Sequence, residues 1–242
     1  MEKILQQKSY KQRECLMLKM NGWTVTVGDT EILPSQSARN IGLYIDPALK
    51  MQHQVTNITR TCYFELRKIA KIRKFLSESA AIKLCHAFVT SRLDNLNSLL
   101  YKIPDYSLKK LQLVQNCTAR LILKLKKHDH ITPALVKLHW LQIPERIEYK
   151  ILLLVFKALS SKGPRYLTEM FVPYKPSRTL RSSSQYLLTE RRCEMRYGER
   201  ALASCGPFLW NKIPIHVRES ESVAIFKSRL KTFLFKRSYN TS

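Results

Sequence analysis

The spacing of apolar residues through the middle of the chain constrains the fold most strongly. From His53 onward, apolar side chains recur three or four positions apart, at Val55, Ile58, Cys62, Leu66, Ile69, Ile72 and Leu76. Because an α-helix turns once every 3.6 residues, this spacing places them all on one face. The pattern predicts an amphipathic helix over about residues 53–76, with its apolar face in a protein core.

Two more helices are predicted directly after the first. Ser77 is a suitable N-cap for the second, because its hydroxyl can accept a hydrogen bond from a free backbone N–H. The inward side chains expected there are Ile82, Cys85, Phe88, Leu96 and Leu99. The third predicted helix runs from about Tyr106 to Lys127, with Leu108, Leu111, Val114, Thr118, Leu121 and Leu125 facing inward.

The stretch "DHITPALVKLHWLQIPERIEYKILLL" (129–154) predicts a corner between two further helices. Pro133 and Pro144 each suit the first helical turn, so we expect a short helix through Leu138 and a longer one to about Ser160. The side chains expected to pack this corner are Leu138, Trp140, Leu141 and Ile143, with His139 packed beside Trp140 in the core. The pair His128 and His130 is expected on a solvated loop, because no third metal ligand lies nearby in sequence.

The flanking regions carry different patterns. Alternating residues in Trp23–Val27 and Arg39–Asp46 predict two strands that pair as a hairpin with a long loop. A short strand is expected at Tyr186–Thr189, and a helix broken at Gly206-Pro207. The last predicted helix is amphipathic through Val223, Phe226, Leu230 and Phe233.

Together these patterns predict a mainly α protein. We expect a helical bundle preceded by a short β-hairpin and followed by a Pro/Ser/Arg-rich arm and C-terminal helices. The expected divisions are a poorly structured leader, the hairpin, the bundle, the basic arm and the C-terminal helical region, over residues 1–22, 23–48, 49–161, 162–185 and 186–242.

The charge of the chain is strongly unbalanced. It has 42 Lys and Arg against 18 Asp and Glu, a formal net charge of +24. A folded domain with this excess repels itself unless a polyanion neutralises it. Nucleic acid is the expected partner, and an anionic membrane surface is the alternative.

Several features indicate an intracellular location. The N-terminal residues lack the apolar segment of a signal peptide, and the longest apolar run, Ile151–Phe156, is far shorter than the roughly 20 residues needed to span a bilayer. The six Cys residues form no CxxC pair, which indicates free thiols in a reducing compartment. We therefore expect a protein of the nucleus or cytoplasm that is neither secreted nor membrane-bound.

Basic residues gather on the predicted helix faces that point away from the core. On the first helix these are Arg60, Arg67, Lys71 and Lys74, and on the third Lys109, Arg120, Lys124 and Lys127. Glu65 is the only acidic residue in the body of the first helix, whereas a merely solvated helix usually mixes signs. Such rows suit a phosphate backbone, which gives affinity without base specificity. The alternative is a solubilising surface.

The predicted arm adds a second, weaker indication. Lys175, Arg178 and Arg181 lie near Tyr174 in a Pro-rich segment. Flexible basic segments with an aromatic ring can contact single-stranded bases by stacking. The arm is therefore a further predicted nucleic-acid contact.

No motif for catalysis is present. The sequence has no phosphate-binding GxxxxGK[ST], no GxGxxG, no GxSxG and no HExxH. Its five Asp residues are never adjacent, and Asp46 and Asp105 are placed as turn or cap residues. The chain is therefore predicted to have no catalytic, metal, cofactor or small-molecule site.

Several blocks resemble one known family. They include "SARNIGLYIDPALKMQHQV", "SRLDNLNSLLYKIP", "HITPALVKLHWLQIPERIEYKILLLVFKAL" and "LWNKIPIHVRESESVAIFKSRLKTFLF". Over about residues 39–237 the chain is similar to the C-terminal part of the reverse transcriptase of non-LTR (LINE) retrotransposons of the jockey and chicken-repeat type. Asn95 and Leu96, which follow the "SRLD" block, depart from the family's usual aromatic and Cys, and residues 1–22 match it poorly.

The resemblance implies a specific part of that polymerase. The hairpin would correspond to the end of the palm and the helices to the thumb, which holds the template–primer duplex. The family's palm motif [YF]-x-D-D, which binds the catalytic Mg²⁺, is absent from this chain, as is the endonuclease domain. We therefore expect a non-catalytic fragment that binds RNA, DNA or hybrid duplex without sequence preference. The alternatives are a helical protein-interaction relic and a part of an active enzyme whose palm is supplied upstream.

Overall fold

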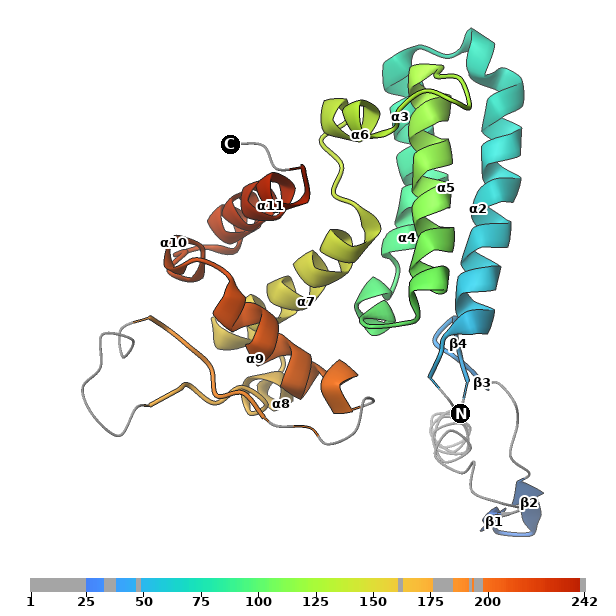
Figure 1. Ribbon diagram of the computed structural model, residues 1–242. Coiled ribbons are helices and arrows are strands. Elements are labelled where there is room, and N and C mark those ends of the chain that lie inside the picture. The colour runs from blue at the N-terminus through green and yellow to red at the C-terminus, as the bar shows by residue number, and fades with distance from the viewer. Residues whose placement is uncertain are drawn as a thin grey trace.

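A computed structural model describes residues 25–32, 38–46, 49–160, 163–175, 185–191, 193 and 198–239. The described part is mainly helical, as predicted, with a long helical bundle on one side and a group of C-terminal helices on the other (Figure 1). The predicted leader 1–22 lies outside the described residues. No helix among those described is both long and apolar enough to cross a membrane.

The predicted strand pairing is wrong. Strands β1 (Val25–Val27) and β2 (Thr30–Ile32) pair with each other, and β3 (Ala38–Asn40) pairs with β4 (Leu43–Ile45), so two short hairpins replace one long-range pair. Each has a two-residue turn, and Gly28 and Gly42 have φ values of 60° and 79°. Glycine permits this left-handed conformation, so each turn closes locally without the entropy cost of a long loop.

Three helical segments form the bundle. In Figure 1, α2 and α5 both rise from the hairpin end, and the segment between them returns alongside. In order they are α2 (Gln52–Ile72), the 3-10 turn η1 (Arg73–Phe75), α3 (Glu78–Cys85), the π-helical turn η2 (His86–Thr90), α4 (Ser91–Asp94), the 3-10 turn η3 (Asn97–Leu100) and α5 (Asp105–Leu123).

The first predicted helix is confirmed over most of its span and inward face, but α2 ends at Ile72, which is 46% exposed and not inward as predicted. The buried side chains of α2 include Val55, Ile58, Cys62, Leu66 and Ile69. The Ser77 cap is confirmed as well, because the Ser77 hydroxyl accepts a hydrogen bond from the Ala80 N–H at 3.1 Å. Periodicity and capping therefore fixed this part of the fold correctly.

The predicted inward face of the second helix is wrong beyond Cys85. Val89 and Leu93 are buried there, whereas Phe88 is exposed. The buried residues Ala81, Cys85, Val89 and Leu93 are four positions apart. Because a regular α-helix has 3.6 residues per turn, residues with this spacing would move progressively away from one face. The π-helical turn η2 has one extra residue per turn, which keeps these side chains on the same face.

The third helix ends earlier than predicted. α5 stops at Leu123, and Lys124 adopts the left-handed conformation, φ 54°, that often closes a helix. Lys127 therefore lies in the turn after the helix and does not extend its basic row.

The corner between helices is confirmed, with one correction. Helix α6 (Thr132–Lys137) begins at Thr132-Pro133, and α7 (Ile143–Leu159) carries Pro144 in its first turn. Trp140 is buried, but His139 is exposed instead of packing beside it. The Trp140 ring instead meets the edge of His86, with the ring centroids 5.7 Å apart.

The C-terminal helices pack against α7. They are α8 (Arg165–Thr168), the 3-10 turn η4 (Gly198–Arg200), α9 (Leu202–Lys212), α10 (Ile215–Arg218) and α11 (Val223–Tyr239). Their core includes a group of aromatic rings, because Phe226 stacks on Phe156 with ring centroids 4.1 Å apart and its ring centroid lies 5.9 Å from that of Trp210. The expected strand at 186–189 is reduced to a single bridge between Pro173 and Leu188.

The predicted break at Gly206-Pro207 is wrong, because α9 continues through both residues. A Cβ atom at Gly206 would lie 2.7 Å from the Phe171 ring and 3.0 Å from the Val155 side chain. Gly206 therefore allows α9 to approach α7 closely, and the packing of α9 outweighs the hydrogen bond that Pro207 removes.

Candidate nucleic-acid interface

The cations predicted on the first helix form an exposed row along α2 and into the 3-10 turn η1, which holds Lys74. We call Arg60, Arg67, Lys71 and Lys74 the α2 basic face. At 100° per residue they fall within about 60° of one another and away from the buried stripe. All four side chains are exposed, and in the described part of the chain none of them forms an ion pair with a carboxylate. Their charge is therefore available to an external anion.

A contact between α2 and α5 relates the two predicted rows. Tyr63 on α2 lies beside Cys117 on α5, and burial, followed by the charge of this thiol, raises the pKa of Tyr63. On each helix the basic row lies beyond this contact, on the side away from the core. The α2 basic face and Lys109 on α5 therefore lie on either side of the line along which α2 packs against α5.

The remaining cations predicted around α5 divide into two groups. Lys109, Lys124 and Lys127 are exposed. Arg120 is half-buried and donates a hydrogen bond to the Asp129 carbonyl oxygen at 3.3 Å, so it closes the turn after α5. Arg120 therefore also has a local structural contact, and its predicted phosphate contact stays a prediction.

The basic arm is described only in part. Lys175 follows the short helix α8 and is exposed. Arg178 and Arg181 lie outside the described residues. The arm therefore contributes one placed cation to the candidate surface.

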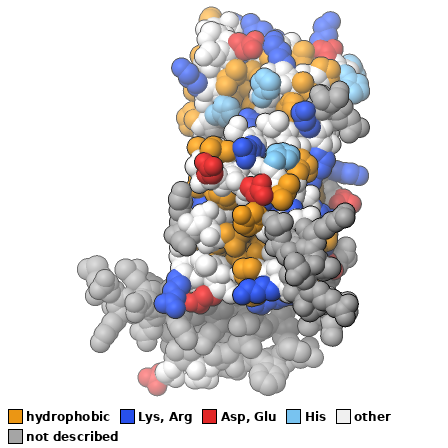
Figure 2. Space-filling model, turned by 90° about the vertical axis from the view of Figure 1, so that its left-hand side faces the viewer, with side chains coloured by type: hydrophobic (Ala, Val, Ile, Leu, Met, Phe, Trp, Pro, Cys, Tyr) orange, Lys and Arg blue, Asp and Glu red, His pale blue; other side chains and the backbone are white. Residues whose placement is uncertain are grey.

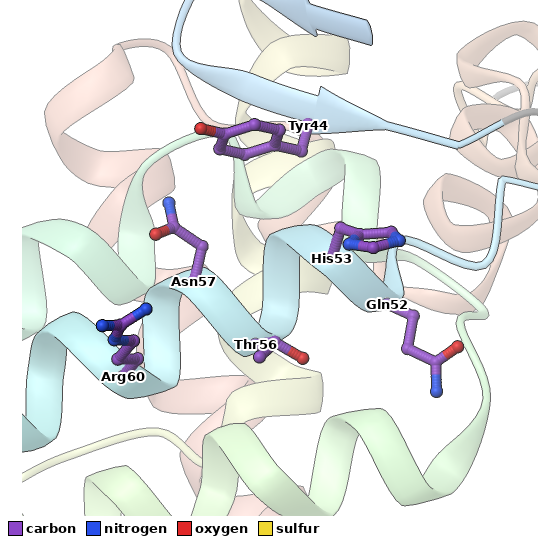
Figure 3. A pocket seen from close by; sticks show the side chains of 6 residues that line it. All are labelled: Tyr44, Gln52, His53, Thr56, Asn57 and Arg60. Carbon is purple, nitrogen blue, oxygen red and sulfur yellow. The ribbon is translucent and has the colours of Figure 1, made fainter. Parts of the chain in front are cut away.

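A polar pocket of about 480 Å³ lies at the N-terminal end of α2 (Figure 3). Tyr44 on β4 covers it from one side, and α2 supplies the other lining side chains, Gln52, His53, Thr56, Asn57 and Arg60. Arg60 belongs both to this pocket and to the α2 basic face. Arg39 lies over the Tyr44 ring, with its guanidinium carbon 5.7 Å from the ring centroid, and adds a cation beside it. The pocket therefore extends the basic surface toward the hairpin.

Exposed aromatic rings lie among these cations. Lys68 Nζ is 4.2 Å from the centroid of the Phe64 ring, and Lys74 Nζ is 4.7 Å from that of Phe75. Phe75 is 77% exposed at the far end of the bundle. Exposed rings beside cations suit contact with unpaired bases.

The side of the molecule away from α2 differs from the α2 basic face in how its charges are distributed. Figure 2 views the side of the C-terminal helices, away from α2, and shows Lys and Arg mixed with acidic and hydrophobic side chains. Several guanidinium groups in this half have protein partners. Arg146 donates to both carboxylate oxygens of Asp94, and Arg237 pairs with Glu148.

One buried arginine was missed from the sequence. Arg73 is 7% exposed and donates to the carbonyl oxygens of Leu121 and Ile122, which belong to the last turn of α5. It also donates to the Leu76 carbonyl oxygen at 2.7 Å. A helical wheel places Arg73 within the apolar stripe of α2, which was the available indication that it does not face solvent.

The acidic and metal-ligating side chains are distributed as structural groups. Asp46 accepts hydrogen bonds from the backbone N–H groups of Lys50 and Met51, which confirms its role in the turn before α2. Asp129 likewise accepts from the Lys126 N–H. Within the described ranges, no cluster of three His, Cys, Asp or Glu side chains could hold a metal ion.

The cysteines of the described part are free thiols. Burial raises the pKa of Cys62, Cys85 and Cys205 to about 11, so these thiols stay protonated at neutral pH. Because the thiolate is the reactive form, the three side chains serve as packing groups.

Comparisons with known proteins give no relative. No family model, curated protein or solved structure matches the chain.

Proposed function

We propose that this chain binds the sugar–phosphate backbone of nucleic acid through the α2 basic face and the adjoining surface of α5. The observation that carries the proposal is the row of four exposed cations without carboxylate partners among the described residues. Contacts of this kind recognise phosphates and not bases, so binding is independent of sequence. The exposed Phe64 and Phe75 rings allow unpaired strands to bind as well as duplexes.

We also propose which kind of protein this chain is part of. The sequence blocks resemble the thumb and following helices of a LINE reverse transcriptase, and a thumb holds a template–primer duplex. In this proposal the chain is a non-catalytic binding region of such a polymerase, because its sequence lacks the paired carboxylates of the palm. A primer-extension assay with Mg²⁺ and deoxynucleotides should therefore give no product with this chain alone.

Filter binding over a range of salt concentrations tests the binding proposal. With four to eight phosphates engaged, the logarithm of the affinity should fall with the logarithm of salt concentration with a slope of about 3 to 7. The triple charge reversal Arg67→Glu, Lys71→Glu and Lys124→Glu should weaken binding equally for unrelated sequences. A flat salt response, or no binding at low salt, would contradict the proposal.

A further inference from the structure

A second groove lies between the bundle and the C-terminal helices. It has a volume of about 370 Å³, within the range of roughly 300–1,000 Å³ found for small-ligand sites. Its lining comes from η2, α4, η3, the α6–α7 corner, α7 and α11. Segments far apart in the sequence therefore meet in this groove.

The groove is positively charged. Arg146, Lys150, Lys227 and Lys231 line it against one carboxylate, that of Asp94. Arg146 neutralises Asp94 through a bidentate pair. The three lysines are exposed, and among the described residues none of them pairs with a carboxylate. Three ammonium groups without a carboxylate partner in the described chain therefore line the same groove.

The other lining groups suit more than a bare anion. The rings of His86, His139 and Tyr149 line the groove beside the buried Trp140, and accessible aromatic rings stack on nucleobases. Asn97 is 4% exposed and lines the groove, and its Oδ1 atom has no hydrogen-bond partner among the described residues. This oxygen is itself buried, so it does not face a ligand in the groove.

We propose that this groove binds one nucleotide unit, with its phosphate held by Lys150, Lys227 and Lys231 and its base against the aromatic side chains. The unit is either a free nucleotide or the phosphorylated end of a strand, since both present the same chemistry. The site is separate from the α2 basic face, and each can fail without the other.

His86 provides a direct readout of phosphate binding. Burial, followed by the charge of Arg146, lowers the pKa of His86; Asp94 opposes this shift and Lys231 adds to it. A phosphate bound among the lysines would favour the protonated imidazole and raise that pKa. A histidine that only packs against Trp140 would not respond to the ligand.

The experiment measures binding by calorimetry and the His86 titration by NMR, on the full chain. The probes are adenosine monophosphate, adenosine, inorganic phosphate, and a pentanucleotide with either a 5′-phosphate or a 5′-hydroxyl. We expect the monophosphate or the phosphorylated pentanucleotide to bind and to raise the pKa of His86. The probe that binds more tightly shows whether the groove takes a free nucleotide or the phosphorylated end of a strand.

A matched pair of variants locates the site. Lys227→Glu with Lys231→Glu should weaken binding about tenfold or more, because each change replaces a proposed ammonium–phosphate contact with a carboxylate that repels the phosphate. Lys83→Glu with Lys236→Glu changes the net charge equally at exposed positions outside the groove and should alter binding by less than about twofold. Arg67→Glu with Lys71→Glu should leave binding of the monophosphate unchanged.

Four results would overturn the inference. They are no binding of either phosphorylated probe, equal binding of adenosine and its monophosphate, equal binding of inorganic phosphate and the monophosphate, and an equal loss in both double variants.

Discussion

The arginines around α7 and α11 and the cations of the α2 basic face differ in their partners, although α7 and α11 also carry the exposed lysines Lys150, Lys227 and Lys231. Around α7 and α11, Arg146 holds Asp94, Arg237 holds Glu148, and Arg229 donates to the carbonyl oxygen of His216 at 2.7 Å. On α2, four cations in a row have no such partners within the described chain. The difference shows that a net charge of +24 contains both structural and free cations, and only the free ones can attract a polyanion.

The two regions also differ in their cores. Aliphatic side chains and the thiols of Cys62 and Cys85 fill most of the bundle core, whereas the C-terminal core adds the stacked rings of Phe156 and Phe226 to its aliphatic side chains. We therefore expect substitutions in the C-terminal core to affect folding and substitutions on the α2 basic face to affect binding alone.

The largest effect is expected from Trp210→Ala. Trp210 packs near Phe226, and its indole N–H donates to the Tyr186 carbonyl oxygen at 2.8 Å. Truncation should lower the free energy of unfolding by about 3–5 kcal/mol, measured by urea denaturation. Arg67→Ala on α2 should change it by less than about 0.5 kcal/mol. A loss below about 1 kcal/mol for Trp210→Ala would mean that this core residue contributes little more to folding stability than a surface residue of α2.

The next largest loss of stability is expected from a change at Arg73 on η1, and its neighbour Lys74 serves as the control. Arg73→Met removes three hydrogen bonds and leaves carbonyl oxygens of α5 without their donor. We expect a loss of about 2–4 kcal/mol in unfolding free energy, since each orphaned buried group costs roughly 1–3 kcal/mol. Lys74→Met, one residue later, should be nearly neutral in the same assay. Equal losses would show that Arg73 does not hold the end of α5.

Much of this comparison could be predicted from the sequence. The apolar spacing gave α2 and its exposed cations, and Ser77, Pro133 and Pro144 gave the helix starts. These features are local, so a few neighbouring residues determine them.

The rest depends on contacts that sequence spacing does not contain. The π turn after Cys85 and the unbroken helix through Pro207 are set by packing against other elements. The groove brings Lys150 together with Lys231, which lies on another helix near the C-terminus. The pairing of Arg146 with Asp94 is equally distant in sequence.

The buried thiols give a pH effect that both regions share. Cys62 and Cys85 in the bundle and Cys205 in the C-terminal region have pKa values of about 11, raised from 9.0 mainly by burial. The unfolded chain loses these protons at lower pH than the folded chain, so stability falls as pH rises from 9 toward 11. The expected loss is about 1.4 kcal/mol per thiol for each pH unit in that range.

Urea denaturation at pH 8, 9 and 10 measures this effect. Cys62→Ala lowers stability at every pH but should make the fall above pH 9 less steep, and Cys205→Ala should do the same. An unchanged slope in either variant would mean that its thiol is accessible to water.

The smallest effect is expected from Phe75→Ala. This ring is exposed beside Lys74, so its loss should leave stability unchanged but remove a stacking surface. Binding of a single-stranded oligonucleotide should weaken by about 1 kcal/mol, with duplex binding unchanged. Phe88→Ala, an exposed ring outside the α2 basic face, is the control. Equal effects of the two changes on single strands would exclude stacking at Phe75.

The salt dependence of binding tests the central claim most directly. Arg67→Ala with Lys71→Ala removes two proposed phosphate contacts, and Lys212→Ala with Lys236→Ala removes two exposed cations from the C-terminal helices. The first variant should reduce the slope of log affinity against log salt by about 1.4–1.8, and the second should leave it unchanged. Equal reductions in both variants would show that total charge, and not the α2 basic face, attracts nucleic acid.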